Sequence, residues 1–131
     1  MPFTVPLNEL AAAGRARVGG KAASLGSLAD AGFAVPDAFA IPVEVAGRLR
    51  GPVDDWPEGV RAAILAAYRG LAGEDSRPVA VRSSGTDEDS EAASFAGLHE
   101  TILDVRGEEA FLDAVAACLE SLYSPAAVAY R

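Results

Sequence analysis

The sequence contains little cysteine, histidine and basic charge, and each shortage narrows the classes of protein that it can encode. Its one cysteine, Cys118, excludes an internal disulfide, and one cysteine with one histidine leaves no metal-binding cluster of these residue types. The apolar runs stop well short of the roughly 20 residues that a membrane span needs. The opening MPFTVPLNEL lacks the basic and apolar segments of a signal peptide. These absences favour a cytoplasmic protein without a membrane partner.

Basic residues are also outnumbered, because the chain carries a formal net charge of −8. Such a balance argues against a nucleic-acid-binding surface. The charge is uneven: residues 1–52 hold five basic and four acidic side chains, whereas residues 53–131 hold six basic and fifteen acidic ones. A small anionic ligand would therefore need a local positive site within a negative field.

The length of 131 residues, half of them hydrophobic, predicts a single domain over residues 1–131 with a real core. Apolar spacing and the positions of glycine and proline predict an α+β fold, with helices packed on a small mixed or antiparallel sheet. We expect an edge strand at residues 3–7, an extended segment at 33–42, a loop at 51–59, and helices at 21–31, 43–50, 60–71 and from 107 onward.

The most informative stretch is Val79–Arg106. It opens with a short apolar strand ending at Arg82 and closes with an alternating strand that begins at Thr101. The loop between these strands is rich in serine, alanine and glycine. An arginine at a strand end, followed by hydroxyls and by small residues that let backbone N–H groups approach, suits a bound anion. A surface hairpin with a long acidic loop fits the composition equally well.

A second candidate site lies at Gly19-Gly20-Lys21, just before the helix expected at residues 21–31. A lysine in a first helical turn is at the unfavourable end of the helix dipole. Its position becomes favourable if an anion binds there to the helix N–H groups and the ammonium together. The alternative is a solvated lysine after a turn.

Taken together, these segments resemble one family. VAVRSSGTDEDSEAASFAGLHET and GGKAASLGSLADAGFAVPDAFAI are similar, in the same order, to the N-terminal nucleotide-binding domain shared by phosphoenolpyruvate synthase, pyruvate phosphate dikinase and rifampicin phosphotransferase. The ending SLYSPAAVAYR is similar as well. The chain departs from the family pattern at Gly85, at residues 90–92, and at Leu98 and His99. The resemblance implies the N-terminal portion of an ATP-grasp fold.

The resemblance also implies roles for individual residues. Lys21 would contact the nucleotide phosphates, and Arg82 would brace them and stabilise charge as the terminal phosphate bond breaks, which makes it the catalytic candidate. A turn over the phosphates would contain Ser94 and Gly97, the latter allowing close approach of the backbone. Thr101 would also lie near the nucleotide.

Other residues with possible chemistry are better explained without it. The acidic residues Glu88, Asp89 and Glu91 lie in a loop and are expected to be solvated, although a metal site is the alternative. His99 follows the SFAG turn and does not match the family's catalytic histidine. Cys118 falls on the apolar stripe of the last helix, and Trp56 is expected to be a packing anchor.

In the family, the chain continues beyond the matched segment. The continuation supplies the adenine-binding edge, the acidic ligands of Mg²⁺ and a phosphohistidine domain, so the resemblance implies an ATP-binding part of a dikinase-type phosphotransferase. The remaining half of the ATP-grasp domain would lie in the same longer chain or in a partner protein, and the resemblance does not imply turnover by this chain alone. The alternative is a non-catalytic binding or assembly module that completes or regulates a partner chain.

Overall fold

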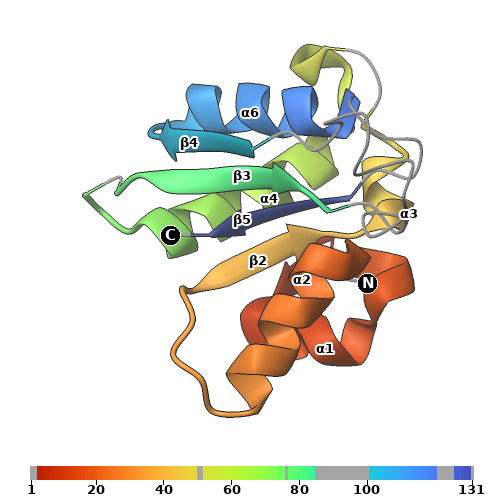
Figure 1. The fold of residues 1–131 in the computed structure, drawn as a ribbon. Helices are drawn as coiled ribbons and strands as arrows, with labels where there is room; N and C mark the ends of the chain where they lie inside the picture. The colour runs from red at the N-terminus through yellow and green to blue at the C-terminus, as the bar shows by residue number, and fades with distance from the viewer. Residues whose placement is uncertain (1–2, 50–51, 76, 85–100, 121–125, 131) are drawn as a thin grey trace.

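The computed structural model describes residues 3–49, 52–75, 77–84, 101–120 and 126–130. In this part of the chain, five strands form one sheet in the order β1-β2-β5-β3-β4, and every neighbouring pair is antiparallel. Helices cover both faces of the sheet (Figure 1). The strands are β1 (Val5–Pro6), β2 (Ala38–Ile41), β3 (Val79–Ser83), β4 (Thr101–Val105) and β5 (Ala127–Tyr130). The α+β class and the edge position of the first strand are confirmed.

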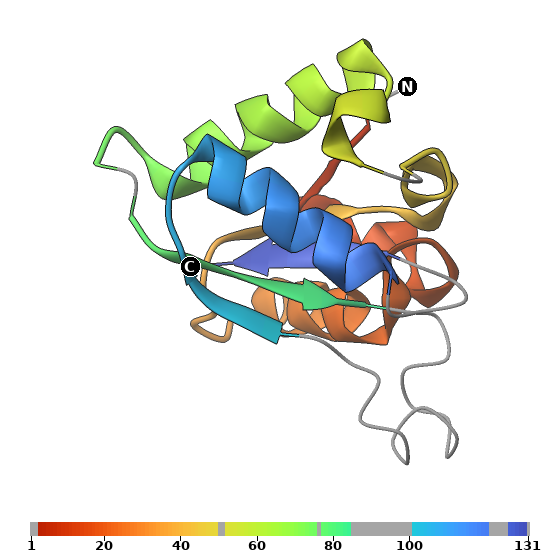
Figure 2. The same ribbon diagram turned by 90° about the horizontal axis from the view of Figure 1, so that it is seen from above.

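One face of the sheet is packed against α3 (Val43–Ala46), α4 (Glu58–Ala72) and α6 (Glu108–Glu120). Figure 2 shows α4 and α6 running across this face. The apolar spacing in residues 60–71 predicted the buried stripe of α4, and Cys118 is fully buried on α6, as expected. Trp56, which follows the short 3₁₀ helix η2 (Val53–Asp55), is buried in the same core. This core is the larger of the two hydrophobic clusters in the described residues, and its burial stabilises the fold.

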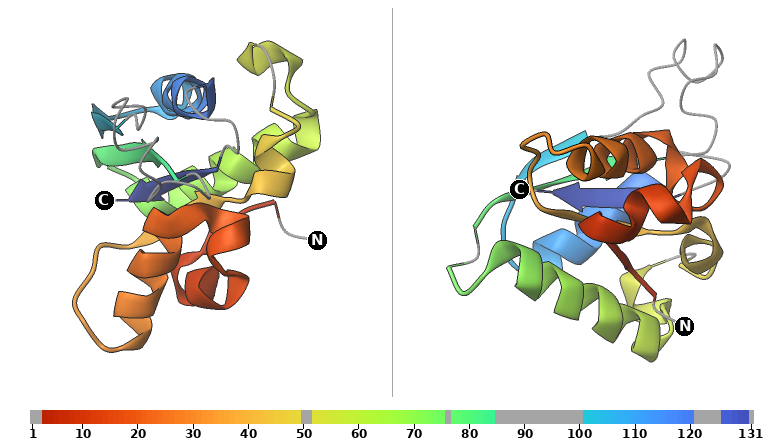
Figure 3. Two further views of the ribbon diagram at one scale, coloured as in Figure 1. Left: turned by 45° about the vertical axis from the view of Figure 1, so that its right-hand side comes forward. Right: turned by 90° about the horizontal axis from the view of Figure 1, so that it is seen from below.

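The opposite face is covered by the N-terminal elements, which are η1 (Leu7–Glu9), α1 (Leu10–Ala13) and α2 (Arg15–Asp30). Val18, Ala22 and Leu25 of α2 pack with residues of β2 and β5 in a second, smaller core. The right-hand view of Figure 3 shows α1 and α2 lying across the sheet. Gly26 allows α1 and α2 to touch, because a Cβ at this position would lie 2.6 Å from the backbone nitrogen of Ala11.

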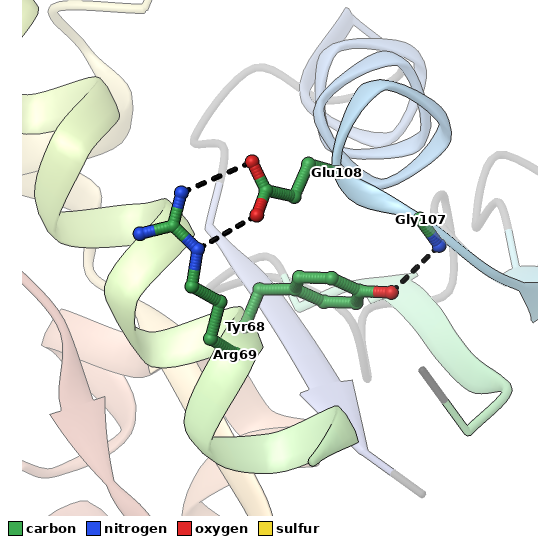
Figure 4. A network of polar contacts seen from close by, with 4 residues as sticks. All are labelled: Tyr68, Arg69, Gly107 and Glu108. Carbon is green, nitrogen blue, oxygen red and sulfur yellow. Dashed lines mark hydrogen bonds and ion pairs between the residues drawn. The ribbon is translucent and has the colours of Figure 1, made fainter. Parts of the chain in front are cut away.

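Two polar contacts join α4 to the start of α6 (Figure 4). The backbone N–H of Gly107 donates to the hydroxyl of Tyr68 at 2.7 Å, and Arg69 forms a two-pronged pair with Glu108 at 2.7 and 3.1 Å. Glu108 lies in the first turn of α6, where the helix dipole favours a carboxylate. The hydrogen bonds from Arg69 lower the pKa of Glu108. These contacts fix the direction in which the chain leaves β4.

Three predictions about the elements need correction. The predicted helix at 21–31 is part of α2, which starts at Arg15 and is interrupted at Gly19, where φ is 84°. Only Ala38–Ile41 of the predicted extended segment pairs as a strand. The helix predicted at 43–50 ends at Ala46, because the following residues turn toward Leu49, which is buried in the larger core.

Candidate functional site

Arg82 lies near the end of β3, on the side of the sheet that α2 covers. It is opposite Thr101 of β4 and Val128 of β5. Directly paired residues of antiparallel strands project to the same face. Val128 belongs to the core formed with α1 and α2, so Arg82 and Thr101 project to that face as well. Arg82 is half-buried and Thr101 is exposed, which leaves this part of the sheet open to solvent.

The helical segment that carries Lys21 begins at a contact with the residue that follows β3. The hydroxyl of Ser84 accepts a hydrogen bond from the backbone N–H of Ala22 at 3.1 Å and donates one to the carbonyl oxygen of Val18 at 2.7 Å. Ala22 is the immediate neighbour of Lys21, and Ser84 lies two residues after Arg82. The structure therefore brings together two segments separated by sixty-two positions in sequence.

Gly19 makes this approach possible. Its φ of 84° and ψ of 166° interrupt α2, so that the helix restarts at Gly20 with Lys21 in its first turn. A Cβ at position 19 would lie 1.4 Å from the carbonyl oxygen of Ser84, a distance that excludes any side chain. The glycine expected to form a tight turn thus also allows two backbones to touch.

The geometry corrects one detail of the anion-binding prediction. Ser83 and Ser84 are fully buried, and both hydrogen bonds of the Ser84 hydroxyl go to α2. The backbone N–H of Ala22 is one of the donors at the helix start, and it donates to the Ser84 hydroxyl instead of to a ligand. The Ser84 hydroxyl is therefore used by α2 and not by a ligand. The predicted site residues that the structure describes are Lys21, Arg82 and the exposed Thr101.

The remaining predicted site residues, Ser94 and Gly97, lie outside the described residues, as do the loop acids Glu88, Asp89 and Glu91. Within the residues that the structure describes, there is no group of three His, Cys, Asp or Glu side chains that could hold a metal ion. The same part of the chain contains no helix that is long and apolar enough to cross a membrane.

The strand β5 was not predicted from the sequence, although it pairs with both β2 and β3 and so connects the two halves of the sheet. It lies in the middle of the sheet between β2 and β3, and the carbonyl oxygen of Ala126, just before it, accepts a hydrogen bond from the backbone N–H of Ser84 at 2.9 Å. The only sequence signal was the short apolar run Ala126–Tyr130, bounded by Pro125. Three segments therefore meet at Ser84, namely the end of β3, the start of β5 and the restart of α2.

A hollow of about 820 Å³ lies elsewhere, between η2, α4 and α6. Its charged lining consists of Asp54, Glu108, Glu109, Asp113 and one arginine, Arg61. A triphosphate would meet mostly repulsive charge in this hollow. The charge of this hollow therefore argues against it as a polyphosphate site.

A charged pair supports α2 close to the site. Arg17 Nε and Nη2 donate to the Glu44 carboxylate at 2.9 and 2.6 Å, joining α2 to α3. These hydrogen bonds lower the pKa of Glu44 and raise that of Arg17. Both side chains are more than one-third exposed, so the pair contributes modestly to stability and its role is to orient the two helices.

Comparison with known proteins identifies the family of the chain but does not report on individual site residues. Residues 53–131 match the family described as pyruvate phosphate dikinase, AMP/ATP-binding domain. Over its full length the chain is 33% identical to the probable phosphoenolpyruvate synthase of Methanocaldococcus jannaschii, of which it covers 14%. It is 33% identical to the phosphoenolpyruvate synthase of Pseudomonas aeruginosa and 32% identical to a rifampicin phosphotransferase from Streptomyces, with 98% of the chain matched in both.

The chain spans only 21% of the Pseudomonas protein and 19% of the Streptomyces protein. The shared segment is thus a small portion of each relative. Because the family match takes in more than half of the residues, the chain belongs to the pyruvate phosphate dikinase AMP/ATP-binding domain family.

Proposed function

We propose that this chain binds the phosphates of ATP through Lys21, Arg82 and Thr101, as the N-terminal part of the ATP-grasp domain of a phosphoenolpyruvate-synthase-like phosphotransferase. The observation that carries the proposal is the contact between Ser84 and Ala22, which joins the end of the strand bearing Arg82 to the start of the helix bearing Lys21. Two cations and an exposed hydroxyl near one junction are the donor set that a polyphosphate requires.

Each of these side chains would act differently. Arg82 presents a planar fork of donors, which suits phosphate oxygens and the charge that develops on them during transfer. Lys21 adds a compact, mobile positive charge at a helix start, where backbone N–H groups also favour an anion. Ser94 and Gly97 belong to the same proposal, as parts of a turn over the phosphates, and Gly97 would let the backbone come close.

Residues 1–131 would then form one domain that supplies one wall of the nucleotide site. Mg²⁺ would be held by acidic ligands from outside this chain, and the phosphate would pass to a histidine on a separate domain, in the same longer chain or in a partner protein. Residues 53–131 contain fifteen acidic side chains, so an anionic nucleotide would be repelled by much of the chain and would depend on Lys21 and Arg82 for attraction. A cytoplasmic location is part of the proposal, since the chain has a single cysteine and therefore does not depend on an internal disulfide.

Titration calorimetry with Mg-ATP tests the proposal in the full-length protein. We expect Lys21→Ala and Arg82→Ala each to weaken binding by about tenfold or more, because a hydrogen bond to a charged group contributes about 1.5–3 kcal/mol. Arg106→Ala is the matched control. Arg106 is an exposed arginine that directly follows β4, and Thr101 lies at the opposite end of that strand. Equal affinities for wild type, Lys21→Ala and Arg82→Ala would refute the assignment.

A further inference from the structure

Ser84 connects the strand that carries Arg82 to the helix that carries Lys21, and its hydroxyl is not available to a ligand. Its side chain is fully buried, and its hydroxyl both accepts from the Ala22 N–H and donates to the Val18 carbonyl. Val18 and Ala22 are on opposite sides of the interruption at Gly19. A single hydroxyl therefore holds the last residue of one helical segment and the first turn of the next, and so fixes the bend between them.

The backbone of Ser84 is held as firmly as its side chain. Its N–H donates to the carbonyl oxygen of Ala126 at 2.9 Å, which ties it to the start of β5. Its own carbonyl oxygen fills the space in which a Cβ of Gly19 would stand. The position of the Lys21 helix start relative to β3 is consequently set by one residue that contacts three segments.

We propose that Ser84 is a positioning residue for phosphate binding, which sets the placement of Lys21 relative to Arg82. The inference rests on the proposed function, because it assumes that both cations contact the same polyphosphate. Charge-assisted hydrogen bonds need fixed donor geometry, and a displacement of about 1 Å at a supporting residue can cost much of their benefit. Loss of the Ser84 hydroxyl frees the bend at Gly19 and lets the helix start move, although Lys21 itself is unchanged.

A merely structural role makes a different prediction. If Ser84 only stabilises the fold, its removal lowers the melting temperature but leaves the affinity of the folded protein for ATP unchanged. If Ser84 acts through Lys21, its removal weakens ATP binding only when Lys21 is present. Coupling between the two substitutions, rather than the loss of stability, is thus the diagnostic quantity.

The test is a double-mutant cycle on Mg-ATP affinity, measured by titration calorimetry in the full-length protein with wild type, Ser84→Ala, Lys21→Ala and the double variant. We expect Ser84→Ala to weaken binding by about fivefold to tenfold, and the double variant to bind no more weakly than Lys21→Ala alone. Ile64→Val, in the core on the other face of the sheet, is the control for general destabilisation and should bind as wild type does.

Each outcome bears on one of the two proposals. Independent effects of Ser84→Ala and Lys21→Ala, or wild-type affinity in Ser84→Ala, would overturn the positioning role while the phosphate-binding role of Lys21 stands. Wild-type affinity in Lys21→Ala would instead remove the proposed function on which the inference rests. If Ser84→Ala fails to fold, Ser84→Cys takes its place in the cycle, because a thiol weakens both hydrogen bonds without abolishing them, and coupling in the same direction but of smaller size is expected.

Discussion

The carbonyl oxygen of Ser84 lies against Gly19 so closely that a Cβ at position 19 would stand 1.4 Å away from it. Gly14 has nearly the same backbone conformation, with φ 87° and ψ 158° against 84° and 166° at Gly19, but a Cβ there would meet nothing within 4 Å. The two glycines share one conformational requirement and differ in steric surroundings, so they form a matched pair for experiment.

We expect Gly19→Ala to destabilise the protein more than Gly14→Ala. A non-glycine residue in this backbone region costs about 1–3 kcal/mol at either position. Overpacking against Ser84 adds at least about 1–3 kcal/mol at position 19 alone, because a clash with a backbone carbonyl can be relieved only by moving the chain. Chemical denaturation of the two variants and the wild type measures both free energies of unfolding. Equal losses for the two variants would show that the close contact with Ser84 costs nothing.

Thr101 allows the nucleotide site to be tested without disturbing the core. Its side chain is exposed on β4, directly opposite Arg82, so Thr101→Val removes one hydroxyl and keeps the shape of the side chain. We expect the melting temperature to stay close to that of the wild type and the affinity for Mg-ATP to fall by about tenfold or more, because a hydrogen bond to a charged phosphate contributes about 1.5–3 kcal/mol. Calorimetric titration checks the affinity. An unchanged dissociation constant would remove Thr101 from the site.

Removing the hydroxyl of Tyr68 is expected to change the stability of the protein without changing its affinity for ATP. Tyr68 is buried, its ring stacks on Phe111 with centroids 4.6 Å apart, and its oxygen accepts the Gly107 N–H. Tyr68→Phe keeps the stacking and leaves that N–H without this acceptor, which costs about 1–2 kcal/mol. We expect a lower free energy of unfolding and wild-type affinity for ATP, because α4 packs on the face of the sheet opposite α2. A loss of affinity would connect the two faces.

The sequence predicted much of the fold because its strongest signals were local. The apolar spacing of Val60, Ile64, Tyr68 and Leu71 determines one face of α4 whatever surrounds it. Alternation and β-branched residues likewise predicted β3 and β4. The strand β5 was missed because an alanine-rich run of this length has little propensity of its own, and it is a strand because β2 and β3 pair with it from both sides.

The site was predictable only in part for the same reason. Arg82, Lys21 and Thr101 were identified by chemistry and by resemblance to a family, and the structure places their elements around one junction. That Ser84 faces α2 instead of a ligand depends on a contact between residues sixty-two positions apart, which no local pattern contains. Serine in a glycine-rich loop suggested an anion contact, whereas the buried hydroxyl of Ser84 instead caps a helix segment.

The Arg17–Glu44 pair predicts how stability depends on pH. Hydrogen bonds from Arg17 lower the pKa of Glu44 below its ordinary value of 4.5 in the folded state. A carboxyl with a lowered folded pKa contributes stability that is present above its unfolded pKa and is lost as pH falls through the folded one. The contribution should therefore be constant from neutral pH down to about 4.5 and should decline below that value.

Glu44→Gln isolates this contribution from those of the other carboxyl groups. We expect the variant to be less stable than the wild type by about 0.5 kcal/mol at neutral pH, since both partners are partly exposed and solvent screens them. The difference between the two proteins should shrink toward zero in acid and in high salt. Thermal melts from neutral to acidic pH, at two salt concentrations, measure this difference. A gap that stays constant below pH 4.5 would mean that the glutamate stabilises α2 and α3 by packing rather than by its charge.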